Sequence, residues 1–391
     1  MPSTTLTIPR PAVSIPRVSV VTAVPWYVWT SVLAVFLGNF GAQWDIAWHR
    51  SIGRDTFWSP PHIAIYAKGV LAGIAFGYLI LHTTFVARRR DDVVTIWGLK
   101  GPLGAFIAAW GGITMITSAP FDDWWHNAYG LDTKIVSPPH IVLLLGGYAI
   151  TAGSIVLVQA LRTRSDDAQR RGLTIAYLVL GGFALVQMMT ALLEWTMLPL
   201  QHSAAMYRAI AIVAPFTICA VAAPSGHRWA CTIMTAVYTA LFLAIMWTFP
   251  FFPAEPKLGP VYFEVTHMIP TMFPLLLIVP AMACDWVLSR TREMVPWKRA
   301  ILFGLTFMVV LLAVQWPFAD FLQSPMGRNP IFGSHYRSFT TLPSSYTATY
   351  RFRIEAAPLE FWRVMVIGFV AAPISAWVGL SLGRWLERIK R

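Results

Sequence analysis

The chain has 391 residues, of which 56% are hydrophobic and 12% are charged. This composition excludes an ordinary soluble domain and predicts a protein that crosses a membrane many times. The formal net charge of +12 does not indicate nucleic-acid binding, because the Lys and Arg residues gather in short clusters between apolar runs. Such clusters predict cytoplasmic loops, so we expect membrane lipid, and not nucleic acid, around the protein.

Apolar runs of about 20 residues, the length that spans a bilayer, recur along the chain and predict an all-α polytopic fold. Residues 1–25 hold several Pro and two Arg and predict a cytoplasmic N-terminal tail. We expect about ten transmembrane helices in successive hairpins, at 26–44, 61–86, 102–119, 138–161, 172–198, 205–223, 229–250, 261–287, 300–317 and 359–383.

These helices divide the chain into regions. Residues 26–165 form a four-helix region, and 166–317 carry the further transmembrane helices. Residues 318–358 are polar and aromatic and include SFTTLPSSYTATYRFRIE, which alternates as strands do, so we expect a small extracytoplasmic cap there. Residues 359–391 give the last helix and a basic tail. The charge pattern predicts a bacterial-type inner (plasma) membrane location with both termini in the cytoplasm.

Two stretches of the four-helix region follow the same order of residues. They are DIAWHRSIGRDTFWSPPH, residues 45–62, and DDWWHNAYGLDTKIVSPPH, residues 122–140. Each has an acid and a His four residues later, which share one face of a helix. Each ends in Ser-Pro-Pro-His, and proline is favoured in the first turn of a helix. Both stretches therefore predict an acid and two His residues at the outer mouth of a helical hairpin.

These residues have the spacing of metal ligands. The first candidate set is Asp45, His49 and His62, and the second is Asp122, His126 and His140. One carboxylate and two imidazoles suit zinc, copper or non-haem iron and leave a coordination position open. Ionisable groups near lipid are costly and mark function by default. The alternative is that the same residues are hydrated or paired groups at the membrane interface.

The first stretch resembles the C subunit of the copper membrane monooxygenases, the particulate methane and ammonia monooxygenase family. That subunit carries Asp-x3-His-x12-His with Trp before the first His, Arg-Asp-Thr in the middle and Pro-x-His-Ile at the end. The matching residues here are Asp45, Trp48, His49, Arg54, Asp55, Thr56, Pro60, His62 and Ile63. The family's second motif, Asn-x3-His-x13-His, is matched by Asp122, Asp123, His126, Pro138 and His140, with Asp122 in place of Asn.

This resemblance covers roughly residues 26–165, and it implies copper at both sites rather than zinc or iron. It implies an integral membrane, copper-dependent monooxygenase subunit or relative that oxidises a small apolar substrate with dioxygen near the outer face. Partner subunits of the A and B types, or a homo-oligomer, are implied as well. The apolar walls would keep the reacting oxygen away from water.

Other polar residues are candidates for supporting roles. Arg54, Asp55 and Asp123 are candidates to orient a ligand His through a hydrogen bond. The alternative for Arg54 and Asp55 is a hydrated surface pair. A further polar group, Glu194, His202, Glu264 and His267, is predicted to lie at the same outer layer as the two motifs. It is a candidate for a third site or a proton path.

Two other classes of function are compatible with the motifs. A metal or copper binding or transport protein would capture its ion at the outer triplets and would need Met and Cys ligands in steps towards the cytoplasm. No such series is evident, and the three Cys residues form no CxxC pair. A non-catalytic assembly subunit would keep the sites for stability. Oxygen uptake coupled to substrate oxidation distinguishes that class from an enzyme.

Overall fold

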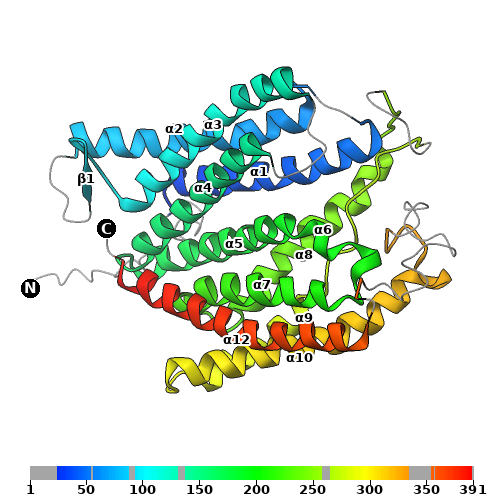
Figure 1. Ribbon diagram of the computed structural model, residues 1–391. Coiled ribbons are helices and arrows are strands. Elements are labelled where there is room, and N and C mark those ends of the chain that lie inside the picture. Colours follow the sequence, from blue (N-terminus) through cyan, green and yellow to red (C-terminus); the bar gives the residue numbers. More distant parts are fainter. Residues whose placement is uncertain are drawn as a thin grey trace, which may run out of the picture.

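The fold is all-helical apart from one short hairpin of strands (Figure 1). The computed structural model describes residues 24–53, 56–87, 93–130, 137–257, 265–333, 354–355 and 357–389. The first region contains α1 (Trp26–Ser51), α2 (Pro60–Phe85), β1 (Val94–Ile96), β2 (Leu99–Gly101), α3 (Leu103–Tyr129) and α4 (Pro138–Arg162).

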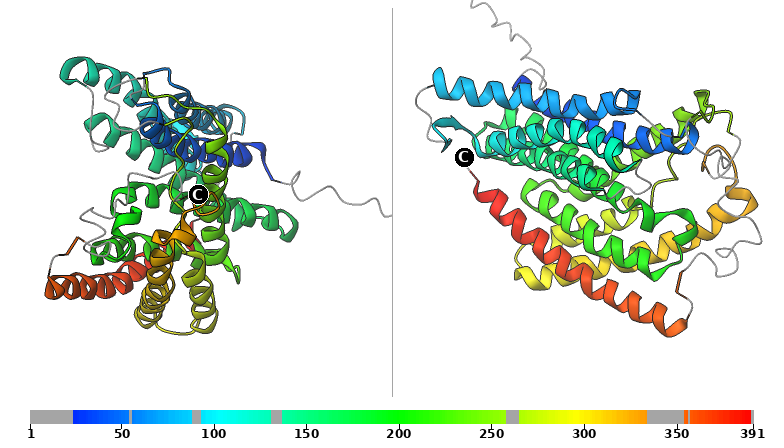
Figure 2. Two further views of the ribbon diagram at one scale, coloured as in Figure 1. Left: turned by 90° about the vertical axis from the view of Figure 1, so that its right-hand side faces the viewer. Right: turned by 45° about the horizontal axis from the view of Figure 1, so that its top comes forward.

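The second region completes the bundle. It contains α5 (Asp167–Ala191), α6 (Leu193–Thr196), η2 (Leu198–Leu200), α7 (Ala204–Ser225), α8 (Ala230–Thr248), η3 (Phe249–Phe251), α9 (Ile278–Arg290), α10 (Pro296–Gln323), η4 (Pro325–Gly327) and α12 (Pro358–Arg388). Seen from the end in Figure 2, α1–α4 lie on one side of the molecule and α9, α10 and α12 on the other.

Eight helices of the described chain are long and apolar enough to cross a membrane. They are α2, α3, α4, α5, α7, α8 with its following turn, α10 and α12. The expected multi-pass helical fold is therefore found, but the expected count of ten is not confirmed. The first predicted span, α1, is long enough but includes Asn39, Gln43 and Asp45. The other missing span is the eighth.

The prediction of a helix over 261–287 is wrong for most of its described part. Helix α9 begins only at Ile278, and residues 265–277 are not helical. Pro270 and Pro274 lie in this stretch and disfavour a helix, because proline lacks the N–H and clashes with the preceding turn. The non-helical backbone finds side-chain partners: Ile269 N–H donates to Ser51 Oγ (2.7 Å), and Leu276 N–H donates to Gln315 Oε1 (2.9 Å). Irregular backbone at membrane depth requires such burial and bonding.

Other boundaries also differ from the prediction. The fifth predicted span, 172–198, is divided, since α5 ends at Ala191 and the short α6 and η2 follow. Helix α10 continues to Gln323, so the first residues assigned to the cap are helical. The cap's strand-like stretch lies almost wholly outside the described residues. The β1–β2 hairpin was not expected; its turn places Trp97 and Gly98 at positive φ (51° and 83°), as a tight two-residue turn requires.

Helices α7 and α12 pack along each other although they are far apart in the sequence. Ser375 of α12 connects them, because its Oγ accepts from Phe216 N–H (3.0 Å) and donates to the Ile212 carbonyl (2.6 Å). Gly383 of α12 leaves room for α7, since a Cβ there would lie 3.1 Å from Pro224 and 3.3 Å from the Ala220 carbonyl oxygen. Small residues allow this close approach of membrane helices.

The buried carboxylate of Asp285, on α9, caps the start of α8. It accepts hydrogen bonds from Cys231 N–H (2.9 Å), Thr232 N–H (2.9 Å) and Thr232 Oγ1 (2.7 Å). We expect Asp285→Ala to lower the free energy of unfolding by about 1–3 kcal/mol, because it leaves buried donors without an acceptor. Thermal unfolding in detergent measures this. Glu293→Ala, at an exposed acid nearby, is the control, and equal effects of the two variants would contradict the capping role.

Candidate metal centres

The two triplets lie at the same end of the molecule. Helices α1 and α3 end there, and α2 and α4 begin there, towards the right of Figure 1. The C-terminal end of α12 and the start of α10, which carry basic residues, lie at the opposite end. The hairpins α1–α2 and α3–α4 thus place both sets of predicted ligands at one end of the bundle, as the sequence predicted.

The local sequence explains how each His is placed. Helix α2 begins at Pro60 and α4 begins at Pro138, so His62 and His140 are both the third residue of their helix. Ser137 Oγ accepts from the His140 N–H (3.4 Å) at the helix start. The paired prolines thus fix where each helix begins, and with it the direction from which the imidazole approaches the preceding helix.

In the second site one carboxylate faces two imidazoles. Asp122 Oδ2 lies 3.4 Å from His126 Nε2, and Asp122 Oδ1 lies 3.5 Å from His140 Nε2. One ligand atom from each of the three residues lies within 4.8 Å of the other two, so these residues could hold one metal ion. Among the described residues, this is the group of three or more His, Cys, Asp or Glu side chains with that geometry. The side chains of all three are partly exposed, between 20% and 32%.

The first site has a similar Asp-His-His arrangement one hairpin earlier, but its three residues are not among the described groups whose ligand atoms all lie within 4.8 Å of one another. Asp45 Oδ2 lies 3.7 Å from His49 Nε2, and Asp45 Oδ1 lies 3.5 Å from His62 Nε2. His49 is 47% exposed, whereas His62 is 16% exposed. His49 is therefore more exposed than either imidazole of the second site, so the first site is the more open of the two.

These separations fit a metal ion better than direct hydrogen bonds. An N–H···O bond is about 2.7–3.2 Å long. Two ligands bonded to one tetrahedral ion at about 2.1 Å lie about 3.4 Å apart. The Oδ1 atoms of Asp45 and Asp122 are buried and have no hydrogen-bond partner among the described residues. A cation held between carboxylate and imidazoles would satisfy these oxygens, so the residues present fit a metal such as copper or zinc.

The predicted supporting residues are placed differently. Arg54, Asp55 and Glu264 lie outside the described residues. Asp123 is exposed, and it accepts bonds from Asn127 Nδ2 at its carbonyl (2.8 Å) and at its side chain (3.4 Å). Its partner is thus a residue of the same helix, one turn away.

The further polar group is not brought together among its described members. Glu194 is exposed on α6, and His267 bonds Thr266 Oγ1 at 3.1 Å. His202 is 2% exposed and stacks on Trp316 at 4.4 Å between ring centres. Its Nε2 lies 3.0 Å from the Trp316 carbonyl and 3.6 Å from Asp320 Oδ1. No metal-competent group of the described chain includes these three residues.

Sequence reasoning missed several ionisable residues in the interior, among them Asp285, Glu355 and Lys68. Lys68 is 3% exposed in the middle of the apolar helix α2. A single Lys inside a membrane-spanning run is itself a signal of function. The partner of His202, Asp320, carries no comparable signal, because nothing in the sequence connects α10 to the turn before α7.

Comparison with models of protein families, with curated proteins and with solved structures finds no match for this chain. The resemblance to the monooxygenase C subunit therefore rests on the two motifs themselves.

Proposed function

We propose that the protein is a membrane metalloprotein that binds copper at its two Asp-His-His sites and acts in the oxidation of a small apolar substrate by dioxygen. The observation that carries this proposal is the convergence of Asp122, His126 and His140 from two helices. The similar facing of Asp45 to His49 and His62 supports it, as does the resemblance of both motifs to the monooxygenase C subunit.

The chain's own residues would hold the metal ion and orient its ligands. Each Asp faces two imidazoles through its two oxygens, so one carboxylate fixes both imidazoles and offsets part of the ion's charge. Three protein ligands leave a position open, as in catalytic metal sites. Bound copper would supply the one-electron and dioxygen chemistry that these side chains lack. Exposed aromatic residues beside the second site, Trp124 and Tyr129, give an apolar approach from the membrane interface.

The test is oxidation by the protein purified from its native membrane with its co-purifying subunits. Samples stripped of metal are reloaded with copper or with zinc, and then receive propene, dioxygen and an added hydroquinone as reductant. We expect epoxide formation, with matching oxygen uptake, only after reloading with copper. Oxidation that is equal after either metal, or absent from the complete complex with copper bound, would overturn the proposal. Copper bound without oxidation would favour a transport or assembly role.

A further inference from the structure

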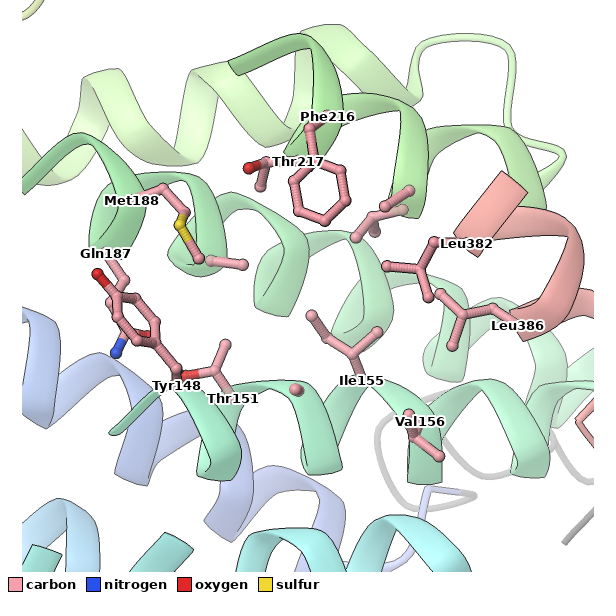
Figure 3. Close-up of a pocket in the computed structure, with 14 residues that line it drawn as sticks. Tyr148, Thr151, Ile155, Val156, Gln187, Met188, Phe216, Thr217, Leu382 and Leu386 are labelled. Carbon is pink, nitrogen blue, oxygen red and sulfur yellow. The ribbon is translucent and has the colours of Figure 1, made fainter. Parts of the chain in front are cut away.

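An apolar cavity of about 210 Å³ lies between α4, α5, α7 and α12 (Figure 3). Its surface is almost wholly apolar and comes mainly from aliphatic and aromatic side chains, such as Ile155, Phe216 and Leu386. Protein interiors rarely hold a void much larger than a water molecule, because side chains pack to fill the space. A void of this size and composition is typical of a site for an apolar molecule.

The hydroxyl groups of the two threonines on the cavity wall are bonded to the protein itself. Thr151 Oγ1 accepts from Lys68 Nζ (3.2 Å) and donates to Gln187 Oε1 (2.9 Å). Thr217 Oγ1 donates to the Val213 carbonyl (2.9 Å). A polar group of a ligand would therefore be buried against apolar atoms and would lose its hydrogen bonds, which is costly. The cavity favours a ligand that has no polar group.

Hydrogen bonds between helices hold the walls of the cavity in place. At the Thr151 end they join α2, α4 and α5. Beyond the opposite end, Arg162 of α4 joins α5 and α7, because its Nε donates to Thr174 Oγ1 (3.1 Å) and its Nη2 donates to the Ser225 carbonyl (2.7 Å). Helices fixed in this way resist collapse into the cavity, and a preformed site binds its ligand with little cost of rearrangement.

The dimensions of the cavity set the size of its ligand. A cavity of about 150 Å³ holds benzene, so by proportion the 210 Å³ here hold about eight carbons. The cavity follows α4 from Tyr148 to Val156, which is about 12 Å of helix. Ala152 and Leu382 are exposed on its wall, so a ligand can enter sideways from lipid, between α4 and α12.

We propose that this cavity binds a free, neutral hydrocarbon of about eight carbons that enters from the bilayer. At the end of the bundle that carries the basic residues, Thr163 Oγ1 donates to the Ile389 carbonyl (3.4 Å) and joins the ends of α4 and α12. A lipid acyl chain tied to a headgroup at that interface would have to pass around this contact before it could enter between the helices. A free hydrocarbon has no such constraint, and this favours it over an acyl chain.

The position of the cavity connects it to the second metal site. About 12 Å of helix separate His140 from Tyr148 on α4, so the cavity begins about two turns from a predicted metal ligand. A hydrocarbon held there has the apolar character of the substrate proposed above. That connection to oxidation rests on the proposed function, whereas the binding of the hydrocarbon does not.

The experiment uses the full chain in lipid nanodiscs and two photoreactive probes with the same diazirine group. One probe is octane that bears the diazirine, and the other is a phosphatidylcholine that bears it in an acyl chain. We expect the octane probe to label α4, α5, α7 and α12 in a saturable way, and the lipid probe to label exposed positions only. Unlabelled octane should compete about tenfold more strongly than octanol at equal concentration in the bilayer, because octanol would bury an unpaired hydroxyl.

Two results would overturn the proposal. Labelling by the octane probe that does not saturate would show that the cavity holds no bound hydrocarbon. Equal labelling of the cavity by the lipid probe would show that its occupant is an acyl chain. Because the crosslinking needs no metal, failure of this binding and failure of the proposed oxidation are separate results.

Variants of the cavity wall test its volume. Ala184→Phe fills the cavity and should abolish saturable labelling. Ile175→Phe, at an exposed position of the same helix, is the control for an added ring and should label as the wild type does. Ile155→Ala enlarges the cavity, so decane, which should compete less strongly than octane in the wild type, should become its equal. Saturable labelling of folded Ala184→Phe at the wild-type level, or an unchanged preference for octane in Ile155→Ala, would contradict the proposal.

Discussion

Replacing Asp122 with alanine is expected to empty the second metal site and to leave the first site occupied. Asp122 is the residue that both imidazoles of its site face, through Oδ2 at 3.4 Å and Oδ1 at 3.5 Å. Without it, two neutral imidazoles on separate helices remain, with no charge to offset the ion's own. The metal content of the purified protein should fall by about one equivalent per chain, because metal affinity depends on the complete ligand set.

The matched control is Asp123→Ala, which removes the neighbouring carboxylate of the same helix. That side chain is exposed and bonds Asn127, so its loss should leave the metal content unchanged. Asp45→Ala should mirror Asp122→Ala at the first site, and the double variant should bind no metal. Elemental analysis by mass spectrometry, with the proteins matched for folding by circular dichroism, measures all four. If Asp123→Ala lost as much metal as Asp122→Ala, the predicted ligand set would be wrong.

The sequence predicted the helices that have clear end signals. The predicted 61–86 and 138–161 agree closely with α2 and α4, because a Pro-Pro pair begins each helix and polar or basic residues follow its end. The third helix was predicted to end at residue 119 but continues to Tyr129, through Pro120. Apolar character ends before the helix does there, so hydropathy alone underestimates the length of this helix.

The convergence of the candidate ligand residues within each hairpin was predictable because their spacing is local. An acid and a His one helical turn apart must share a face, and a Pro-Pro-His start brings the next helix back to it. The interior was not predictable in this way. The contact of Lys68 with Thr151 joins residues 83 positions apart, and it depends on which helices pack together. The glycines that set that packing look alike in the sequence whether they face a neighbouring helix or lipid.

Because Gly111 of α3 faces a neighbouring helix, the substitution Gly111→Val is expected to have the second large effect, a loss of stability. A Cβ at Gly111 would lie 2.6 Å from the Gly146 carbonyl oxygen and 2.7 Å from the Ile150 backbone nitrogen of α4. Backbone atoms cannot move aside as a side chain can, so α3 and α4 must separate. We expect the free energy of unfolding to fall by about 3 kcal/mol, the upper part of the range for overpacking.

Separation of α3 from α4 should also weaken metal binding at the second site. His126 projects from α3 and His140 from α4, so the second site forms only while these helices keep their distance. Gly73→Val in α2 is the control, because a Cβ at Gly73 meets nothing within 4 Å and the change in helix propensity is the same. Thermal unfolding and metal content, measured on both variants, should show loss of stability and of the second-site ion for Gly111→Val alone. Retention of both properties by Gly111→Val would mean that the α3–α4 contact does not position the site.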